Sequence, residues 1–353
     1  MEGSCALGRF SGQVLRGGAT GVGWPTTDDR SRSEAKFAPF PLDVAAVWAL
    51  FAVVAVEILV TYSRLPAREL YHVSGSGLTG GASRALVFLN FPLALVAIPI
   101  LAFLSQRLAS RSAKVVAVIG IVLSAAIFWP GIVKQSDLDA RPVNAVAALG
   151  VLVAVSLTVV TARSLTRPVR PVRQPGDRLR VVVAAAALAL AVPWIGADLG
   201  LSFDGVPVLG TLYQTGELRA QPGVTALHPA VHHGHHHGMD GVLLVLSALL
   251  LSRLLSSAPR GWLRGLLGAY LALMLCYGAG NVANDFWLEQ VVKRGWTEWQ
   301  IPDVTTPKAS VAWGVIVLSA AALWGISVWR VRSALITQST QVSGEPWATH
   351  HGR

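Results

Sequence analysis

Eight apolar runs, each close to the length of a membrane-spanning helix, restrict the fold of this chain more than any other feature of its sequence. A helix needs about 20 residues to cross the hydrocarbon core of a bilayer. Inside lipid every backbone N–H and C=O group must find a partner within the protein, and a helix provides these partners within one segment. The sequence therefore predicts an all-α fold, a polytopic integral membrane helical bundle of about eight transmembrane helices. The predicted spans are residues 43–63, 84–104, 114–133, 143–163, 180–200, 240–256, 262–286 and 309–330.

The composition agrees with a membrane location, because 53% of the residues are hydrophobic and only 14% are charged. Soluble domains carry about 25% charged residues. We expect the polar stretches 1–40 and 334–353 to be disordered cytoplasmic tails, which leaves 41–333 as the transmembrane domain. The basic residues are 24 Arg and 5 Lys, a bias that suggests a GC-rich bacterial genome.

The positive-inside rule gives the predicted orientation. Six arginines lie in the linker after the fourth span, so this linker is predicted to be cytoplasmic, with both termini on the same side. The cytoplasmic side then holds 20 basic and 7 acidic residues, and the outer side holds 9 and 12. The net charge of +10 is thus explained by topology in a cell membrane, with the lipid bilayer as partner and without nucleic acid. The linker arginines are Arg163, Arg167, Arg170, Arg173, Arg178 and Arg180.

A histidine-rich segment before the sixth span, predicted to be extracytoplasmic, holds six of the nine histidines. If the sixth helix begins early, His228, His232, His236 and Asp240 share one helix face, and neighbouring imidazoles at such spacing can chelate one ion. Imidazole suits Zn, Cu, Ni or Fe. The alternatives are a low-complexity tract without a fixed site, or a sensor of mildly acidic pH. The candidate metal ligands are His228, His232, His233, His235, His236, His237 and Asp240.

A polar stripe lies near the outer end of the seventh span. Asn281, Asp285 and Glu289 follow one another at helical spacing, with Asn284 beside them. Polar groups at membrane depth usually face other polar groups or a water-filled cavity, so these four residues are candidates for lining a cavity. The alternative is that they form interhelical hydrogen bonds that only hold the bundle together.

Three residues on the predicted outer side could act as a catalytic acid or base, namely Glu57, His72 and Asp285. Glu57 lies within the first span, where a carboxylate is energetically expensive and is usually functional. No P-loop, HExxH or kinase signature accompanies them. Whether the chain is an enzyme is left open by the sequence.

Several functional hypotheses therefore stand side by side. The first is a membrane protein that binds a transition metal at an outward-facing site of histidines and acidic groups. The second is a membrane enzyme that acts on a lipid or a lipid-linked substrate. The third is a transporter or a non-catalytic assembly factor. The reaction or cargo and the oligomeric state do not follow from the sequence.

The orientation gives the first testable prediction. A cysteine introduced at Gly223, in the loop before the histidines, should react with a membrane-impermeant thiol reagent in intact cells. A cysteine introduced at Gln174, in the arginine linker, should react only after lysis. Reversed labelling would place the histidines in the cytoplasm, and labelling of both positions from outside would show that the span count is wrong.

Overall fold

The structure is a computed structural model, and it does not describe every residue. All described helices belong to one compact unit, Phe40–Arg353, and the predicted N-terminal tail lies outside the described residues. The last residues of the predicted C-terminal tail, 344–353, also lie outside them. The described residues are 42–64, 75–129, 140–163, 173–199, 201–213, 218–219, 227–229, 237–258, 261–302, 304 and 309–343.

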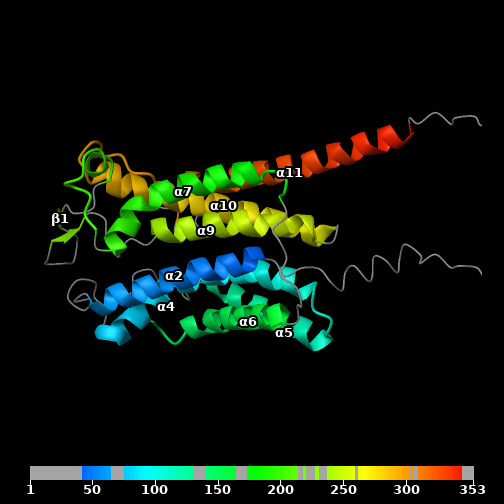
Figure 1. The fold of residues 1–353 in the computed structure, drawn as a ribbon, viewed down its shortest axis with the longest axis horizontal. Coiled ribbons are helices and arrows are strands. Elements are labelled where there is room, and N and C mark those ends of the chain that lie inside the picture. Colours follow the sequence, from blue (N-terminus) through cyan, green and yellow to red (C-terminus); the bar gives the residue numbers. More distant parts are fainter. Residues whose placement is uncertain are drawn as a thin grey trace, which may run out of the picture. The chain divides into compact units, whose positions relative to one another are not determined.

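The described elements are almost entirely helical, with one pair of two-residue strands (Figure 1). The strands pair antiparallel. In chain order the elements are α2 (Leu42–Arg64), α4 (Gly77–Ser105), α5 (Arg111–Ala125), η1 (Ala126–Phe128), α6 (Asn144–Arg163), α7 (Asp177–Asp198), α8 (Leu209–Leu212), β1 (Leu218–Arg219), β2 (His228–Pro229), α9 (His237–Ser252), η2 (Arg253–Ser256), α10 (Trp262–Trp287), η3 (Leu288–Val292) and α11 (Val311–Ser343).

The prediction of a polytopic helical bundle is confirmed. The described residues contain eight helices that are long and apolar enough to cross a membrane, one for each predicted span. Some helices are longer than their apolar runs: α4 begins at Gly77 rather than at 84, and α10 continues through η3 to Val292 rather than ending at 286. Helix α11 continues to Ser343 and so runs past the start of the predicted C-terminal tail.

The histidine segment does not extend the sixth helix back to His228, as the stripe of candidate ligands required. His228 lies in β2, where it pairs with Arg219 of β1, and the described part of α9 runs from His237. The interpretation of His228 and Asp240 as two members of one helical face is therefore wrong. A strand before the helix is in keeping with the sequence, because Pro229 and Gly234 both weaken a continuous helix.

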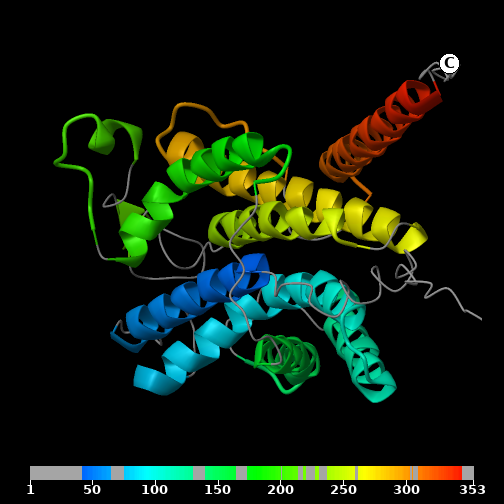
Figure 2. The same cartoon turned by 45° about the vertical axis from the view of Figure 1, so that its right-hand side comes forward.

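The eight helices form two groups of four, which we call the N-terminal half (α2, α4, α5 and α6) and the C-terminal half (α7, α9, α10 and α11). Figure 2 shows the blue and cyan helices of the first group on one side and the yellow and orange helices of the second on the other. Within the N-terminal half α4 contacts the other three helices. Helices α5 and α6 approach closely at Gly120 and Gly150, since a Cβ atom on Gly150 would lie 2.8 Å from the Gly120 carbonyl oxygen.

The C-terminal half is built around the antiparallel pair α9 and α10. The two backbones nearly touch at Gly241 and Gly278: a Cβ atom on Gly241 would lie 2.6 Å from the Gly278 carbonyl oxygen. Small residues permit such contacts between membrane helices, where packing replaces the hydrophobic effect as the driving force. Helix α11 packs on the outside of α10, with the rings of Tyr277 and Trp313 stacked at 5.5 Å.

The two halves meet where α2 and α4 pack against α9 and α10. Tyr270 of α10 donates a hydrogen bond of 2.8 Å from its hydroxyl to the Leu95 carbonyl of α4. Nearby, the rings of Phe91 of α4 and Tyr277 of α10 meet edge to face at 6.2 Å. Helices α4 and α9 are accordingly the most enclosed spans. In each of them 61% of the residues in the apolar stretch are buried, compared with 11% in α11.

The glycine contact in the C-terminal half generates a stability prediction. Gly278→Ala adds a methyl group at 2.8 Å from the Gly241 carbonyl, so the helices must separate, and overpacking of this kind costs about 1–3 kcal/mol. The midpoint of thermal unfolding in detergent should fall.

The matched control is Gly265→Ala in the same helix, where an added methyl group meets nothing within 4 Å. This variant should be as stable as the parent or more stable, because Ala is a better helix former than Gly by about 1 kcal/mol. Equal effects of the two substitutions would contradict the close contact.

Candidate functional site

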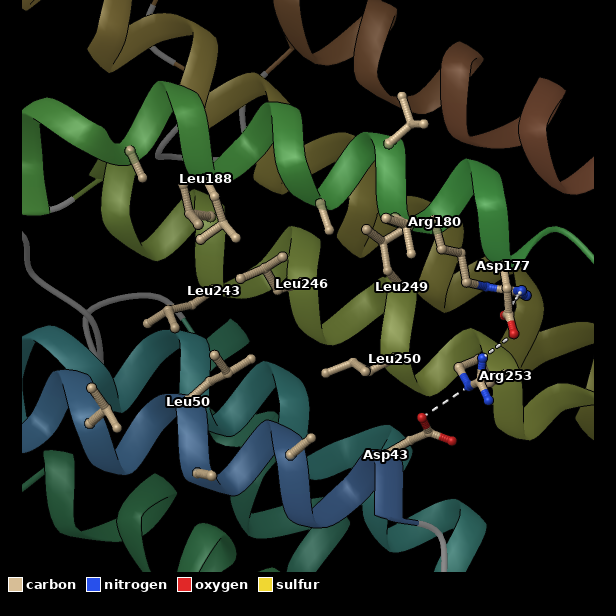
Figure 3. Close-up of a pocket in the computed structure, with 18 of the residues that line it drawn as sticks. Asp43, Leu50, Asp177, Arg180, Leu188, Leu243, Leu246, Leu249, Leu250 and Arg253 are labelled. Atoms are coloured by element: carbon tan, nitrogen blue, oxygen red, sulfur yellow. Dashed lines mark hydrogen bonds and ion pairs between the residues drawn. The ribbon is translucent and has the colours of Figure 1, made fainter. Parts of the chain in front are cut away.

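A large groove runs between α2 of the N-terminal half and α7 and α9 of the C-terminal half (Figure 3). Its volume is about 1800 Å³. Because α2 and α7 make few direct contacts, the faces that they turn toward each other are not filled by packing. Aliphatic side chains form most of the wall, and six of them are Leu50, Val53, Val54, Leu188, Leu243 and Leu246.

The wall contributed by α2 is one face of that helix. Its lining residues include Asp43, Ala46, Leu50, Val53 and Glu57, which recur every three or four positions. This spacing keeps side chains on the same side of a helix. The groove thus has an acidic residue at each end of its α2 wall and only apolar residues between them.

Charged residues close the groove at the end where α2 and α7 begin and α9 ends. Arg253 Nε lies 3.0 Å from Asp43 Oδ1, and Arg253 Nη1 lies 2.5 Å from Asp177 Oδ2. Arg180 Nη1 lies 3.0 Å from Asp177 Oδ1, and Arg180 Nε donates to Ser252 Oγ at 2.9 Å. Figure 3 shows these side chains together at one end of the groove, and we call Asp43, Asp177, Arg180 and Arg253 the charged mouth.

The charged mouth is also favourable for the helices that carry it. Asp43 and Asp177 lie in the first turns of α2 and α7, and Arg253 directly follows the last turn of α9. Acidic groups are favourable near the positive end of the helix dipole and basic groups near the negative end. Because Asp43 belongs to the N-terminal half and Asp177 to the C-terminal half, Arg253 links the two halves.

Two further arginines line the same end of the groove. Arg173 and Arg178 are exposed, and neither forms an ion pair with any residue that the structure describes. The groove lining therefore contains four arginines at this end, together with only Asp43 and Asp177 as acids. The positive excess is available to a negatively charged group that enters the mouth.

Glu57, a predicted catalytic residue, lines the groove away from the charged mouth. Its Oε1 atom accepts a hydrogen bond of 3.2 Å from Thr61 one turn further along α2. Asp285, the second predicted acid, is also described and does not line the groove. His72, the third, lies outside the described residues. The described residues thus do not bring Glu57 and Asp285 to one catalytic centre.

The polar stripe of α10 forms a second, separate cluster with the start of α9 and the end of α7. Asp285 is buried and its Oδ2 atom accepts a hydrogen bond of 2.8 Å from the Gly238 amide, in the first turn of α9. Glu289 is fully buried, and its Oε2 atom accepts from the Trp194 indole at 2.9 Å. Lys293 Nζ lies 3.9 Å from the other Glu289 oxygen. These contacts fix the positions of α7, α9 and α10 relative to one another.

The amides of the stripe bond to nearby backbone. Asn281 is buried and donates to the Tyr277 carbonyl of its own helix at 2.9 Å. Asn284 donates to the Ile301 carbonyl at 2.7 Å and so holds the segment after α10 against it. The Asn284 contact, like those of Asp285 and Glu289, supports the interpretation that the stripe holds neighbouring segments together, whereas the Asn281 bond stays within α10. A role for the stripe in lining a cavity stays a prediction.

Arg84 of α4 is a buried charge to which no sequence motif points. Its guanidinium carbon lies 3.4 Å from the ring centroid of Phe88 and 5.2 Å from that of Tyr62. Cation–π contacts are strongest when the cation is desolvated, as it is here. Through Tyr62 the Arg84 side chain packs against α2, near the end of that helix opposite the charged mouth.

Four of the seven candidate metal ligands lie outside the described residues. His232, His233, His235 and His236 lie outside the described residues, while His237 is the first residue of α9. Within the described ranges, no three His, Cys, Asp or Glu side chains come together as a group that could hold a metal ion. The histidine site therefore stays a prediction.

The comparisons with known proteins do not assign the chain to a family. No protein-family model, no curated protein and no solved structure matches it. The geometry of the groove and of its charged mouth is thus the basis for a functional proposal.

Proposed function

We propose that the groove binds a membrane lipid with an anionic headgroup. The observation that carries the proposal is the continuous apolar wall between α2 and α7, which ends at a mouth with more arginines than acids. The lipid tail lies along the wall, and Arg173 and Arg178 face the headgroup. A lipid-modifying enzyme and a lipid transporter both need such a site, so the proposal is shared by these two alternatives.

The size of the groove supports an occupant of lipid size. Pockets for small molecules have volumes of about 300–1,000 Å³, and this groove exceeds that range at about 1800 Å³. A lipid tail gains little from the apolar wall, because the surrounding lipid is equally apolar. Selectivity must then come from the headgroup, and charge at the mouth is the feature that can supply it.

The predicted orientation places the charged mouth on the cytoplasmic side. Arg173 and Arg178 belong to the arginine linker that the positive-inside rule assigns to this side. Anionic lipids are also found in the cytoplasmic leaflet. Their headgroups attract basic side chains near the surface, and each Lys or Arg contributes about 1 kcal/mol of binding free energy. The proposed ligand therefore enters from the cytoplasmic leaflet.

The headgroup proposal is tested by measuring lipid binding to the purified protein by native mass spectrometry. Phosphatidic acid should bind more tightly than phosphatidylcholine with the same tails. The double variant Arg173→Ala and Arg178→Ala should weaken phosphatidic acid binding by about thirtyfold. This factor corresponds to a loss of about 1 kcal/mol of binding free energy for each arginine. Binding of phosphatidylcholine should change little.

The matched control is Arg111→Ala with Arg330→Ala. It removes the same charge from two exposed arginines that are also predicted to be cytoplasmic but do not line the groove. Equal losses in the two double variants would show that only the general positive charge attracts the lipid. Equal binding of both lipids to the parent protein would exclude the proposal.

We further propose that the histidine segment binds a transition metal, Zn, Cu, Ni or Fe. Support comes from the way the segment ends: His237 opens α9, and the next residue, Gly238, is held by the carboxylate of Asp285. The histidine segment therefore leads directly into a helix whose first turn is held in place by a hydrogen bond. Asp285 and Glu289 are acidic groups at the same end of the bundle, and a carboxylate near an imidazole can orient its ring.

Equilibrium metal titration of the purified protein tests this second proposal. Replacing His232, His233, His235, His236 and His237 with Ala should remove the high-affinity binding of the parent protein. The control replaces His350 and His351, the two C-terminal histidines, and should leave the binding unchanged. Binding that is no weaker in the five-histidine variant would exclude a metal site in the segment.

A further inference from the structure

The groove is longer than one leaflet is deep. Its α2 wall reaches from Asp43 to Glu57 and its α9 wall from Met239 to Arg253. At about 1.5 Å of rise per residue each of these walls is about 21 Å long. One leaflet contributes only about 15 Å, half of the hydrocarbon core of about 30 Å. A lipid tail confined to one leaflet would leave the far part of the groove empty.

The chemistry of the two ends opposes a second anionic lipid from the other leaflet. All four arginines that line the groove lie at the charged mouth or beside it. At the far end the described lining offers a carboxylate, Glu57, and no basic residue. A phosphate there would face a like charge. Between the ends the described walls are apolar, so no headgroup position exists near the midplane.

The groove also has room for a tail with methyl branches. Four alanines line it, two on α2 and two on α7. Their short side chains widen the groove between the larger Leu and Val residues. The alanines are Ala46, Ala49, Ala184 and Ala191.

We infer that the ligand is a single lipid phosphate whose tail is longer than one leaflet, and that a polyprenyl phosphate is the chemical class that fits. This inference rests on the proposed function and adds the identity of the tail. The phosphate lies at Arg173 and Arg178, and the isoprenoid chain follows α2 past the midplane toward Glu57.

The test compares three phosphates by native mass spectrometry of the purified full-length protein: undecaprenyl phosphate, geranyl phosphate and dioleoyl phosphatidic acid. All three carry a phosphate monoester, so differences in their binding are caused by the tail. We expect undecaprenyl phosphate to bind at least tenfold more tightly than either of the others. Equal binding of phosphatidic acid and undecaprenyl phosphate would overturn the inference and leave the proposed function standing.

Val53→Trp is designed to block the groove partway along α2. Position 53 lies ten residues after Asp43, which is about 15 Å at a helical rise of about 1.5 Å per residue. This variant should lose the preference for undecaprenyl phosphate and keep the binding of geranyl phosphate, whose two isoprene units end before the block. Val53 is 68% exposed, so the larger ring does not disturb the core. Leu188→Trp, on the α7 wall, repeats the block from the other side.

The control is Val56→Trp, at a position 59% exposed that does not line the groove. It should behave like the parent protein. If both blocked variants keep the tenfold preference, the tail does not follow the groove and the inference is wrong. If none of the three phosphates binds more tightly than the uncharged alcohol undecaprenol, the proposed function itself fails.

Discussion

Arg253 holds together the part of the structure from which a function can be argued. It bonds to Asp43 at the start of α2 and to Asp177 at the start of α7, so one guanidinium joins three helix ends and both halves. Partly buried charges in such a position are stable only when they are well paired. The bridge keeps α2 and α7 together at one end, although the two helices make few contacts along the rest of their length. The groove exists because the halves are joined at α4, α9 and α10 and, on the α2 side, at this bridge.

The helices could be predicted from the sequence, and the groove could not. Apolar runs of sufficient length must become helices in lipid, because no other single segment satisfies its own backbone there. The groove depends on which faces of α2, α7 and α9 are turned toward each other. In sequence, the face of α2 that carries Ala46, Leu50 and Val53 is indistinguishable from a face that meets lipid. The members of the charged mouth are, in sequence, ordinary charges within or close to the end turns of their predicted spans.

The polar residues of the spans illustrate the same limit. Asp285 and Glu289 were predicted to meet polar groups, and they do, but their described partners include the Gly238 amide and the Trp194 indole. The Gly238 amide could not be chosen from residue type, because every residue except proline carries a backbone N–H. The Trp194 indole could not be chosen because it belongs to another helix, whose facing side the sequence does not give. The helical histidine stripe was wrong at His228, which lies in β2. The next residue, Pro229, is unfavourable inside a helix, and the regular spacing of the histidines did not take this into account.

The close contact of Gly241 with Gly278 has a mechanical consequence. Two helices whose backbones touch cannot come any closer, so α9 cannot shift toward α10 at this contact. One side of α9 is a wall of the groove, and Gly238 lies in the first turn of the same helix. The α9 wall therefore cannot yield toward α10 near Gly241, and any occupant of the groove has to fit the space that α9 leaves.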